Sequence, residues 1–433
     1  MRNRLIKRFL LLLFILLTLI QWNHLFAQQK KRCGTVEYMA RLKTEDPTLA
    51  VSIEKTESIV QHIAIENQRS ENVSSIITIP VVFHIMYQNG TQNISENRIT
   101  DQLATLNKDF GRFNADTNNT PLSFRSISAN TNIRFCFAQR DPNGDTTNGI
   151  VRVPVTVTGF DPLSNNKLKY TAQGGNDAWP RDQYLNIWVC NFSGSSSQIL
   201  GVSQLPGAAA ATDGCCVLYT TVGGTTYPGT EPGYHLGRTL THEAGHWLGL
   251  YHVWGDDGGG CSGTDYVADT PNQGGENYFC PAFPRTDNCS VSSPGVLFMN
   301  YLDYVDDNCM NMFTTGQSNR MNGFLNGVRS PIVNSNGCMA PIGIEELKRS
   351  LNYFSVFPNP ASRVITVAFI LNKKSDVMIS VRDLPGQIIF SKELKDVSSV
   401  HLPIDLFDAA PGMYQVSLKT MDAVANKKII LTR

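Results

Sequence analysis

The sequence lacks an excess of charge of either sign, because its 37 lysines and arginines balance its 37 aspartates and glutamates. A chain without net charge creates no field that attracts nucleic acid or anionic lipid. It also lacks a basic stripe with interleaved aromatic residues, the footprint of a nucleic-acid interface. We therefore expect no nucleic-acid partner. The 42% of hydrophobic residues is enough for globular cores, and the length suggests two or three domains.

Long apolar runs are absent after the N-terminus, so we expect no stable transmembrane segment. A basic start precedes an apolar run from Phe9 to Ile20, which is too short to span a bilayer comfortably. This pattern is typical of a secretory signal peptide, residues 1–27, cleaved after Ala27. An uncleaved membrane anchor is the alternative.

Cysteines are not scarce: there are ten, which fits an oxidising destination, but none lies in a Cys-x-x-Cys pair. Their wide spacing argues against a zinc site built from cysteines. Four of them lie between residues 252 and 310, and four cysteines allow three pairings between which the sequence does not choose. These four are Cys261, Cys280, Cys289 and Cys309. Five others remain unpaired by sequence reasoning: Cys136, Cys190, Cys215, Cys216 and Cys338.

The most informative segment runs from His242 to His252. His242 and His246 are four residues apart, so on a helix both face one metal ion. Glu243 can act as general base toward a metal-bound water, and Gly249 permits a turn that brings His252 back as third ligand. Catalytic zinc takes three protein ligands and keeps a position open for water. The alternatives are ordinary helix histidines, or a non-catalytic surface binding protein that keeps a zinc fold.

An apolar stripe supports a helix here, with the histidines on the opposite side. The stripe consists of Leu236, Leu240, Ala244, Trp247, Leu248 and Tyr251. One side of the helix is therefore expected to pack into a core, and the other to face a cleft.

The segment matches the extended zinc signature of metzincins, and the flanking sequence resembles the bacterial branch of the pappalysin family. Other family-like segments are Leu200-Gly201, Pro206-Gly207, Thr212–Gly214 and Asn300–Tyr304. The resemblance implies a secreted zinc metalloendopeptidase that acts on proteins or peptides. It also implies an α/β (α+β) catalytic domain, residues 70–338, with a twisted sheet, a backing helix and an active-site helix. We expect a monomer.

The resemblance also implies roles for particular residues. The disulfides should be Cys261–Cys289 and Cys280–Cys309. Tyr304 matches a tyrosine thought to stabilise the oxyanion, although a buried turn aromatic is the alternative. Adjacent cysteines 215 and 216 occupy a strand that is usually apolar in the family, which predicts their burial.

Two positions depart from the family pattern. Leu302 stands where the Met-turn usually has methionine; the two side chains have similar volumes, so we expect activity to survive. Asn308 stands where some relatives carry an aspartate that selects a basic residue after the scissile bond. An amide loses the charge-assisted hydrogen bond, so basic specificity is in doubt unless Asp306 or Asp307 substitutes.

Cys33 follows the expected signal peptide and precedes a polar, helix-prone stretch. In related zymogens a cysteine of the pro-segment plugs the active-site zinc, and a thiolate is a strong zinc ligand. We expect residues 28–69 to form a pro-segment with Cys33 as its latch, cleaved near Arg69-Ser70 in a polar tract. A disulfide-bonded or stray cysteine is the alternative.

Several aspartates, including Asp256 and Asp257, lie among glycines after the zinc motif. Hard oxygen ligands on a flexible loop suit calcium, but the EF-hand spacing is absent. Calcium is common in the resembled family, and we expect Asp265, Asp269 and Thr270 as ligands. A solvated acidic loop is the alternative.

Within the catalytic region, Ile76–Tyr87 is expected to be a central strand and Ser95–Asn114 an amphipathic helix capped by Ser95. Its buried face should hold Ile99, Leu103, Leu106, Phe110 and Phe113. Two more strands are expected at Asn132–Arg140 and Tyr184–Phe192, and an irregular half held by disulfides after Gly249.

The last residues form a separate unit, 352–433, after a linker at 339–351. Short alternating strands predict an all-β sandwich: Ile365–Ile370, Val377–Arg382, Ile388–Ser391 and Met413–Leu418. The segments Pro358–Pro360, Asp383–Gly386, Pro411–Tyr414 and Lys427–Leu431 resemble the sorting domain of type IX secretion. The resemblance implies secretion machinery as a partner and a secreted or surface-attached protein. A generic adhesion-like β-domain is the alternative.

Overall fold

The computed structural model describes residues 30–69, 75–341, 351–420 and 424–432. The chain divides into two compact units: one runs up to Ala138 and from Asn148 to Cys338, and the other holds Gln139–Thr147 and the chain from Met339 onward. The expected signal peptide and Ser70 of the expected cleavage site lie outside the described residues. No helix in the described ranges has both the length and the apolar character needed to cross a bilayer.

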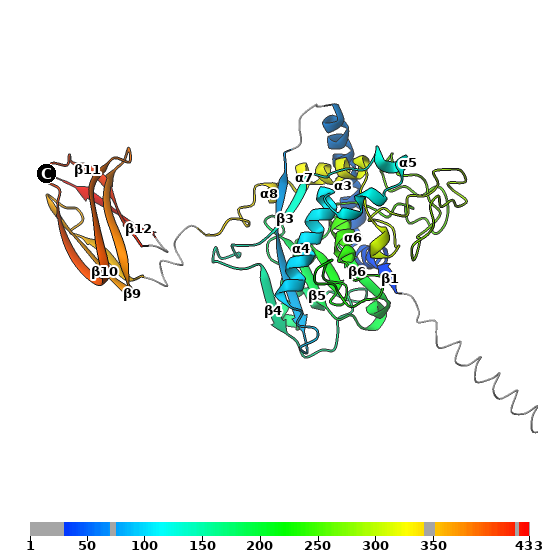
Figure 1. The fold of residues 1–433 in the computed structure, drawn as a ribbon, viewed down its shortest axis with the longest axis horizontal. Coiled ribbons are helices and arrows are strands. Elements are labelled where there is room, and N and C mark those ends of the chain that lie inside the picture. Colours follow the sequence, from blue (N-terminus) through cyan, green and yellow to red (C-terminus); the bar gives the residue numbers. More distant parts are fainter. Residues whose placement is uncertain (1–29, 70–74, 342–350, 421–423, 433) are drawn as a thin grey trace, which may run out of the picture. The chain divides into compact units, whose positions relative to one another are not determined.

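A seven-stranded sheet forms the centre of the first unit (Figure 1). Its order is β1-β6-β7-β5-β2-β3, with β4 also paired to β2, and every pair is parallel except β6 with β7. Parallel strands are covered on both faces and read as apolar runs, which explains why β2 is buried along almost its whole length. The strands are β1 (Lys31–Cys33), β2 (Ile77–Tyr87), β3 (Ile133–Phe137), β4 (Ile150–Pro154), β5 (Leu185–Cys190), β6 (Ile199–Ser203) and β7 (Cys215–Leu218).

Seven α-helices accompany this sheet in the described residues: α2 (Thr35–Glu45), α3 (Thr48–Arg69), α4 (Glu96–Gly111), α5 (Leu122–Arg125), α6 (Arg238–Trp247), α7 (Thr315–Asn326) and α8 (Ser330–Val333). Ser95 caps α4 as expected, because its hydroxyl accepts a hydrogen bond from the Arg98 N–H. The helix ends at Arg112, whose φ of 55° is left-handed. Phe113 therefore leaves the helical periodicity and is 66% exposed; its expected burial was wrong.

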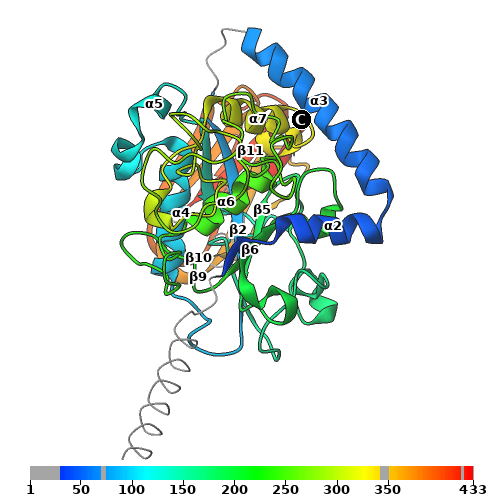
Figure 2. The same cartoon turned by 90° about the vertical axis from the view of Figure 1, so that its right-hand side faces the viewer.

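Apolar side chains pack on both faces of the sheet. On one face α4 and α6 contribute to the core, through residues such as Phe110 and Trp247. On the other face the N-terminal helices α2 and α3 supply Tyr38, Met39, Leu42, Leu49 and Ile53. Burial of each large side chain contributes about 1.5–3 kcal/mol. The N-terminal segment is therefore held by a substantial apolar contact, and Figure 2 shows β1 beside β6 with α2 and α3 following it.

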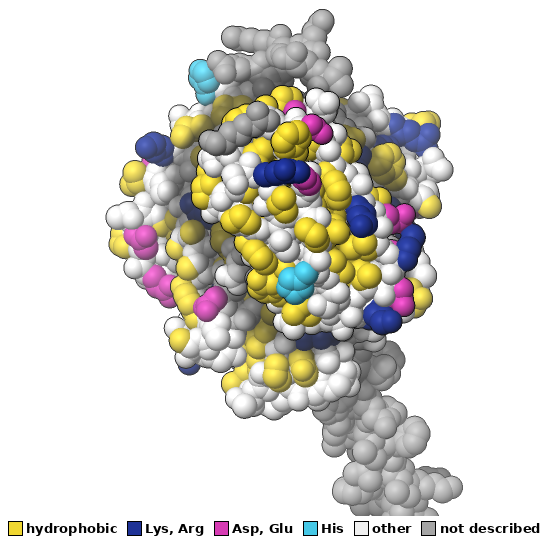
Figure 3. Space-filling model, turned by 90° about the vertical axis from the view of Figure 1, so that its left-hand side faces the viewer, with side chains coloured by type: hydrophobic (Ala, Val, Ile, Leu, Met, Phe, Trp, Pro, Cys, Tyr) yellow, Lys and Arg dark blue, Asp and Glu magenta, His cyan; other side chains and the backbone are white. Residues whose placement is uncertain are grey.

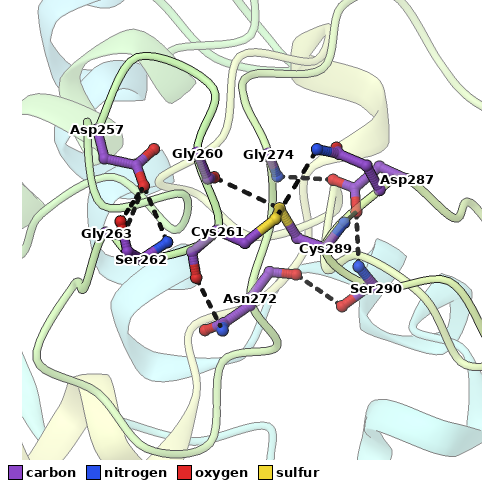
Figure 4. Close-up of a disulfide and its surroundings, with 11 residues drawn as sticks. Asp257, Gly260, Cys261, Ser262, Gly263, Asn272, Gly274, Asp287, Cys289 and Ser290 are labelled. Carbon is purple, nitrogen blue, oxygen red and sulfur yellow. Dashed lines mark hydrogen bonds between the residues drawn. A yellow bond between two sulfur atoms is a disulfide. The ribbon is translucent and has the colours of Figure 1, made fainter.

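The chain between α6 and α7, all of which is described, contains loops and a single short 3-10 helix, Asp307–Cys309. Disulfides join Cys261 to Cys289 and Cys280 to Cys309, the pairing that the family resemblance implies. Asp287 ties the loops near the first bond, since its carboxylate accepts hydrogen bonds from the N–H groups of Gly274, Cys289 and Ser290 at 2.7–2.8 Å (Figure 4). Covalent and polar ties thus replace regular secondary structure here.

A third disulfide, Cys136–Cys338, links β3 to the end of the first unit across 202 residues. Sequence reasoning left both of these cysteines unpaired. Cys33, Cys190, Cys215 and Cys216 are free and buried. The burial of the adjacent pair on β7 agrees with the expectation.

The second unit is all-β, with antiparallel strands in the order β10-β9-β11-β12 and β8 paired to β9. The strands are β8 (Leu351–Phe357), β9 (Val364–Asp383), β10 (Ile388–Asp405), β11 (Gly412–Lys419) and β12 (Val424–Leu431). Two strands expected at Ile365–Ile370 and Val377–Arg382 are parts of the single strand β9. Strand β10 pairs with β9 along its length, with register shifts. The polar stretch between Ile370 and Val377 therefore stays in the sheet. Many hydrophobic side chains reach the surface shown in Figure 3.

Candidate active site

Helix α6 carries the first two histidines and is buried along its whole length. Asp109 of α4 holds the helix: its carboxylate accepts hydrogen bonds from the Thr241 hydroxyl at 2.9 Å and the Tyr301 hydroxyl at 3.0 Å. Arg238 adds an ion pair to Asp109 at 3.3 Å. Buried hydrogen bonds and ion pairs of this kind rigidify what they hold. The helix therefore presents its histidines from a fixed position.

The three histidines of the motif converge on one point. Nε2 of His246 lies 3.0 Å from Nε2 of His242 and 3.1 Å from Nε2 of His252. Cys33 joins them, and among the described residues these four form the one group of His, Cys, Asp and Glu side chains suited to a metal ion, with ligand atoms within 4.8 Å of one another. All four residues are buried.

The second ring nitrogen of each histidine faces an acceptor. The Nδ1 partners are the carbonyl oxygen of Tyr301 for His242 (2.7 Å), the carbonyl oxygen of Leu250 for His246 (2.8 Å) and the carboxylate of Asp256 for His252 (2.7 Å). These oxygens accept hydrogen bonds, so Nδ1 carries a proton in each ring, and in the neutral form of a ring the lone pair is on Nε2. Three lone pairs aimed at one point repel each other unless a cation lies between them.

The donor set fits zinc. Tetrahedral zinc with bonds of about 2.0–2.1 Å holds its ligand atoms about 3.3 Å apart, close to the observed separations of 3.0 and 3.1 Å. Burial, and then the charge of His252, lowers the pKa of His246 to about 3. Burial and the neighbouring histidines also hold the pKa of His242 well below its usual value. Both rings are therefore neutral at pH 7, which is the form that binds a metal.

Gly249 makes the turn that returns the chain to the histidines. Its φ is +89°, and a Cβ there would lie 2.0 Å from the Phe324 ring. Any other residue would be strained in backbone conformation and would clash. Leu302 lies under α6, since a Cβ at Gly245 would come within 3.0 Å of its Cδ2. Leu302, at the position where the Met-turn usually has methionine, thus forms an apolar surface beneath the helix.

Glu243 lies between α6 and β6. A Cβ at Gly201 would meet its Oε1 at 2.5 Å, so the glycine makes room for the carboxyl group. Oε2 accepts a hydrogen bond from the Thr35 hydroxyl at 3.2 Å, whereas Oε1 is buried without a hydrogen-bond partner. Burial raises the pKa of Glu243 to about 8, and a cation held by the histidines would lower it toward the ionised form that a general base needs. An unpartnered buried carboxyl oxygen is costly and marks a group placed for chemistry.

Strand β1 carries Cys33 across this site. It pairs in parallel with β6, with Cys33 opposite Gly201. Burial, and then the charge of Glu243, raises the pKa of the Cys33 thiol. The Tyr304 hydroxyl donates a hydrogen bond to the Cys33 carbonyl oxygen at 3.1 Å, and its ring lies 5.1 Å from that of His252. The expected latch and the expected oxyanion tyrosine are therefore in contact.

Sequence reasoning missed Arg32, the residue before the latch. Its side chain is fully buried, and Nη2 donates to the Asp307 carboxylate at 2.9 Å and the Val305 carbonyl at 2.6 Å. Its guanidinium also lies 4.7 Å from the centroid of the Tyr234 ring. Asn308 is exposed, whereas the neighbouring Asp307 is buried and its carboxylate pairs with this guanidinium. The sequence signal is an arginine directly before the cysteine.

Sequence reasoning also missed how the third histidine is oriented. Asp256, considered above as part of the calcium loop, instead accepts the hydrogen bond from Nδ1 of His252, and the Trp254 ring stacks on that histidine at 4.4 Å. An outer carboxylate fixes the ring of a metal-binding histidine and raises its basicity. The spacing of four residues between His252 and Asp256 is the signal that could have indicated this role.

The residues expected to bind calcium are already bonded within the chain. Asp265 accepts hydrogen bonds from the Thr270 hydroxyl at 2.8 Å and the Val267 N–H at 3.0 Å. Asp269 caps α7 by accepting a hydrogen bond from the Gly316 N–H at 2.8 Å. Burial raises the pKa of Asp265 to about 6. A calcium site at Asp265, Asp269 and Thr270 stays a prediction.

Two family models match the chain. Residues 169–326, which include α6, match the family described as pregnancy-associated plasma protein-A, and residues 355–432 match the secretion system C-terminal sorting domain. An extracellular metalloprotease of Colletotrichum graminicola is 31% identical over 292 residues, covering 63% of this chain and 89% of that protein. Another from Neurospora crassa is 46% identical over 154 residues, 34% of this chain, and the match spans only 50% of its own length.

Solved structures agree with these matches. Mature mirolysin of Tannerella forsythia, in complex with a cleaved peptide, is 49% identical with a TM-score of 0.58, and covers 60% of this chain and 97% of its own. A promirolysin mutant from the same organism is 44% identical with a TM-score of 0.63, covering 70% and 97%. The first unit thus has the metzincin fold. The chain belongs to the pappalysin family of metzincin zinc metalloendopeptidases and is a secreted or cell-surface protein with a type IX secretion sorting domain.

Proposed function

We propose that His242, His246 and His252 hold the catalytic zinc and that Glu243 is the general base in peptide-bond hydrolysis. The convergence of three Nε2 lone pairs, each fixed by a bond at Nδ1, is the observation that carries this proposal. When bound, zinc polarises water and the substrate carbonyl. Glu243 takes the proton from the attacking water and returns it to the departing amine.

Tyr304 is proposed to donate a hydrogen bond to the developing oxyanion. Its contact with the Cys33 carbonyl supports this, because a backbone carbonyl beside the histidines occupies the place that a substrate carbonyl would take. In the latent form, burial and then the charge of Cys33 raise the pKa of Tyr304 well above its usual value. An ordinary phenol already has a pKa of about 10, so the hydroxyl also keeps its proton at neutral pH after Cys33 has left, and it can donate.

A zinc chelator is expected to abolish casein hydrolysis by the mature enzyme, because the three imidazoles alone cannot activate water. Ortho-phenanthroline serves as the chelator, its non-chelating meta isomer as the control, and metal content is measured on the same samples. Added zinc should restore activity. Full activity in a sample shown to be free of metal would refute the proposal.

We further propose that residues 28–69 are a pro-segment and that Cys33 is the fourth ligand of the zinc in the latent form. A closed four-ligand site leaves no position for water. Support comes from the shared position of Cys33 and the histidines, and from Thr35, whose hydroxyl engages the general base. Cleavage near Arg69-Ser70 would release both residues from the cleft.

Replacing Cys33 with alanine should raise the peptidase activity of the unprocessed zymogen at least about tenfold. Loss of a residue that only supports a metal ligand already changes metal affinity or activity by about 10–100-fold, and loss of a direct ligand should have at least the smaller effect. The readout is hydrolysis of a short peptide by a form that cannot be cleaved at Arg69-Ser70. Cys190→Ala is the control, because Cys190 is also free and buried but lies outside the metal-binding group. Unchanged latency in Cys33→Ala would refute the latch.

The contact between Arg32 and Asp307 supports a preference for lysine or arginine in the substrate. By family resemblance, the site around Asp307 takes the substrate residue after the scissile bond. A buried carboxylate that binds the guanidinium of Arg32 in the latent form can bind a basic substrate side chain in the same way, by a charge-assisted hydrogen bond. The proposed partners are therefore proteins with basic cleavage sites, and the secretion machinery that reads the C-terminal unit.

A further inference from the structure

Arg320 of α7 is a buried arginine at the edge of the candidate active site. Its side chain is 4% exposed, and its Nε donates a hydrogen bond to the Gly249 carbonyl oxygen at 2.8 Å. Its guanidinium lies 5.3 Å from the centroid of the Tyr251 ring and 5.2 Å from that of Tyr266. The turn that positions the third histidine thus also fixes this cation.

Glu57 of α3 occupies the place facing this cation. Nη2 of Arg320 lies 2.6 Å and 2.8 Å from its two carboxylate oxygens, and the Tyr251 hydroxyl donates to one of them at 3.2 Å. The glutamate belongs to the segment that we propose is removed on maturation. Its departure would leave the guanidinium without this hydrogen-bonded carboxylate, and a substrate carboxylate can make the same charge-assisted hydrogen bonds.

Asp265 is a second carboxylate that feels the charge of Arg320, but its hydrogen bonds are made to other groups. The carboxylate of Asp265 is held by the Thr270 hydroxyl and the Val267 N–H. The aromatic rings on the guanidinium fix its plane and exclude water, which suits recognition of a planar carboxylate.

This position is connected to the catalytic residues. A cavity of about 650 Å³ lies between His246, His252, Tyr251 and Tyr266 on one side and helices α2 and α3, including Glu57, on the other, so it becomes an open groove once these helices leave. Arg320 donates to Glu57 at the wall of this cavity. A peptide that passes the histidines can therefore reach the place that Glu57 holds in the latent form.

We propose that Arg320, with Tyr251 and Tyr266, forms a subsite for an acidic side chain of the protein substrate once the N-terminal segment has left. The inference rests on the proposed peptidase function and deepens it. Glu57 would stand in for the acidic substrate residue, just as Arg32 stands in for a basic one. The enzyme would then select substrates that carry both charges at a fixed separation.

The test uses the mature enzyme and peptides with one fixed cleavage site, in which glutamate is moved through each position and compared with glutamine. One position should show a kcat/KM ratio of glutamate over glutamine of roughly tenfold, the usual worth of a hydrogen bond to a charged group. In Arg320→Gln this ratio should fall to about one. The ratio is internal to each enzyme, so a general loss of activity does not affect it.

Lys108→Gln is the control, because it removes the same charge from an exposed position on α4 and should keep the tenfold ratio. If Arg320→Gln does not fold, Arg320→Lys keeps the charge but loses the planar fork, and its ratio should fall to an intermediate value. The absence of a glutamate-preferring position, or an unchanged ratio in the Arg320 variants, would overturn the inference.

Two outcomes separate this inference from the others. If Glu57→Gln weakens latency but no substrate position prefers glutamate, Arg320 only anchors the N-terminal segment and the subsite does not exist. If the glutamine peptides are not cleaved either and the wild-type enzyme holds no zinc, the proposed function itself has failed.

Discussion

Glu243→Gln is expected to lower kcat/KM for a protein substrate by roughly 10²–10⁴-fold while the zinc content stays at the wild-type level. Glutamine has the same shape but cannot accept a proton from water at neutral pH. It does not belong to the proposed ligand set, so the three imidazoles should still hold the metal. The space that Gly201 leaves for the side chain should accommodate the amide.

The measurement pairs steady-state kinetics with metal analysis on the mature protein. Glu276→Gln is the control, because Glu276 is exposed and the substitution removes the same charge. A Glu243→Gln enzyme that retains both zinc and activity would show that another group takes the proton. Loss of zinc together with activity would show that the carboxyl group supports the metal site and is not only a base.

Asp307→Asn should remove the proposed preference for a basic residue after the scissile bond. It should lower kcat/KM for an arginine peptide by roughly 100-fold, since truncating one partner of a buried charge pair is costly. The carboxylate has a second task, because its other oxygen accepts a hydrogen bond from the Leu236 N–H at 2.8 Å. Asparagine keeps one oxygen for that bond. The loss should therefore fall on substrate selection more than on folding.

Asn308→Asp is the informative control for this prediction. It restores the carboxylate at the family position, but that position is exposed, so no gain in arginine preference is expected. Cleavage of arginine and alanine peptides that differ only at the residue after the scissile bond gives the readout. If Asp307→Asn keeps the preference, or Asn308→Asp strengthens it, Asp307 is not the selecting residue.

Local patterns in the sequence predicted what local physics decides. The spacing of His242 and His246 requires a helix to bring them together, and Gly249 is needed because its φ of +89° suits glycine. The cap at Ser95 and the buried strand at Ile77–Tyr87 follow in the same way from short-range hydrogen bonding and apolar runs. Each of these features depends on residues a few positions apart.

Features that depend on distant partners could not be predicted in this way. Arg32 meets Asp307 across 275 residues, and Glu57 meets Arg320 across 263. The pattern of residues around any of these four positions does not indicate which distant residue it will contact. Phe113 shows the limit even at short range, because one left-handed residue, Arg112, ended the helix before the apolar pattern did.

The bond between Cys136 and Cys338 has a consequence for the release of the enzyme. It fastens the last residue of the catalytic unit to the central sheet, and closing a loop of 202 residues disfavours unfolding by roughly 5 kcal/mol in the chain-entropy view. A cut anywhere in residues 339–351 would therefore separate the peptidase from its sorting domain and leave this disulfide and the loop it closes intact. The catalytic unit can therefore lose the sorting domain and keep its own fold, as long as the surroundings remain oxidising.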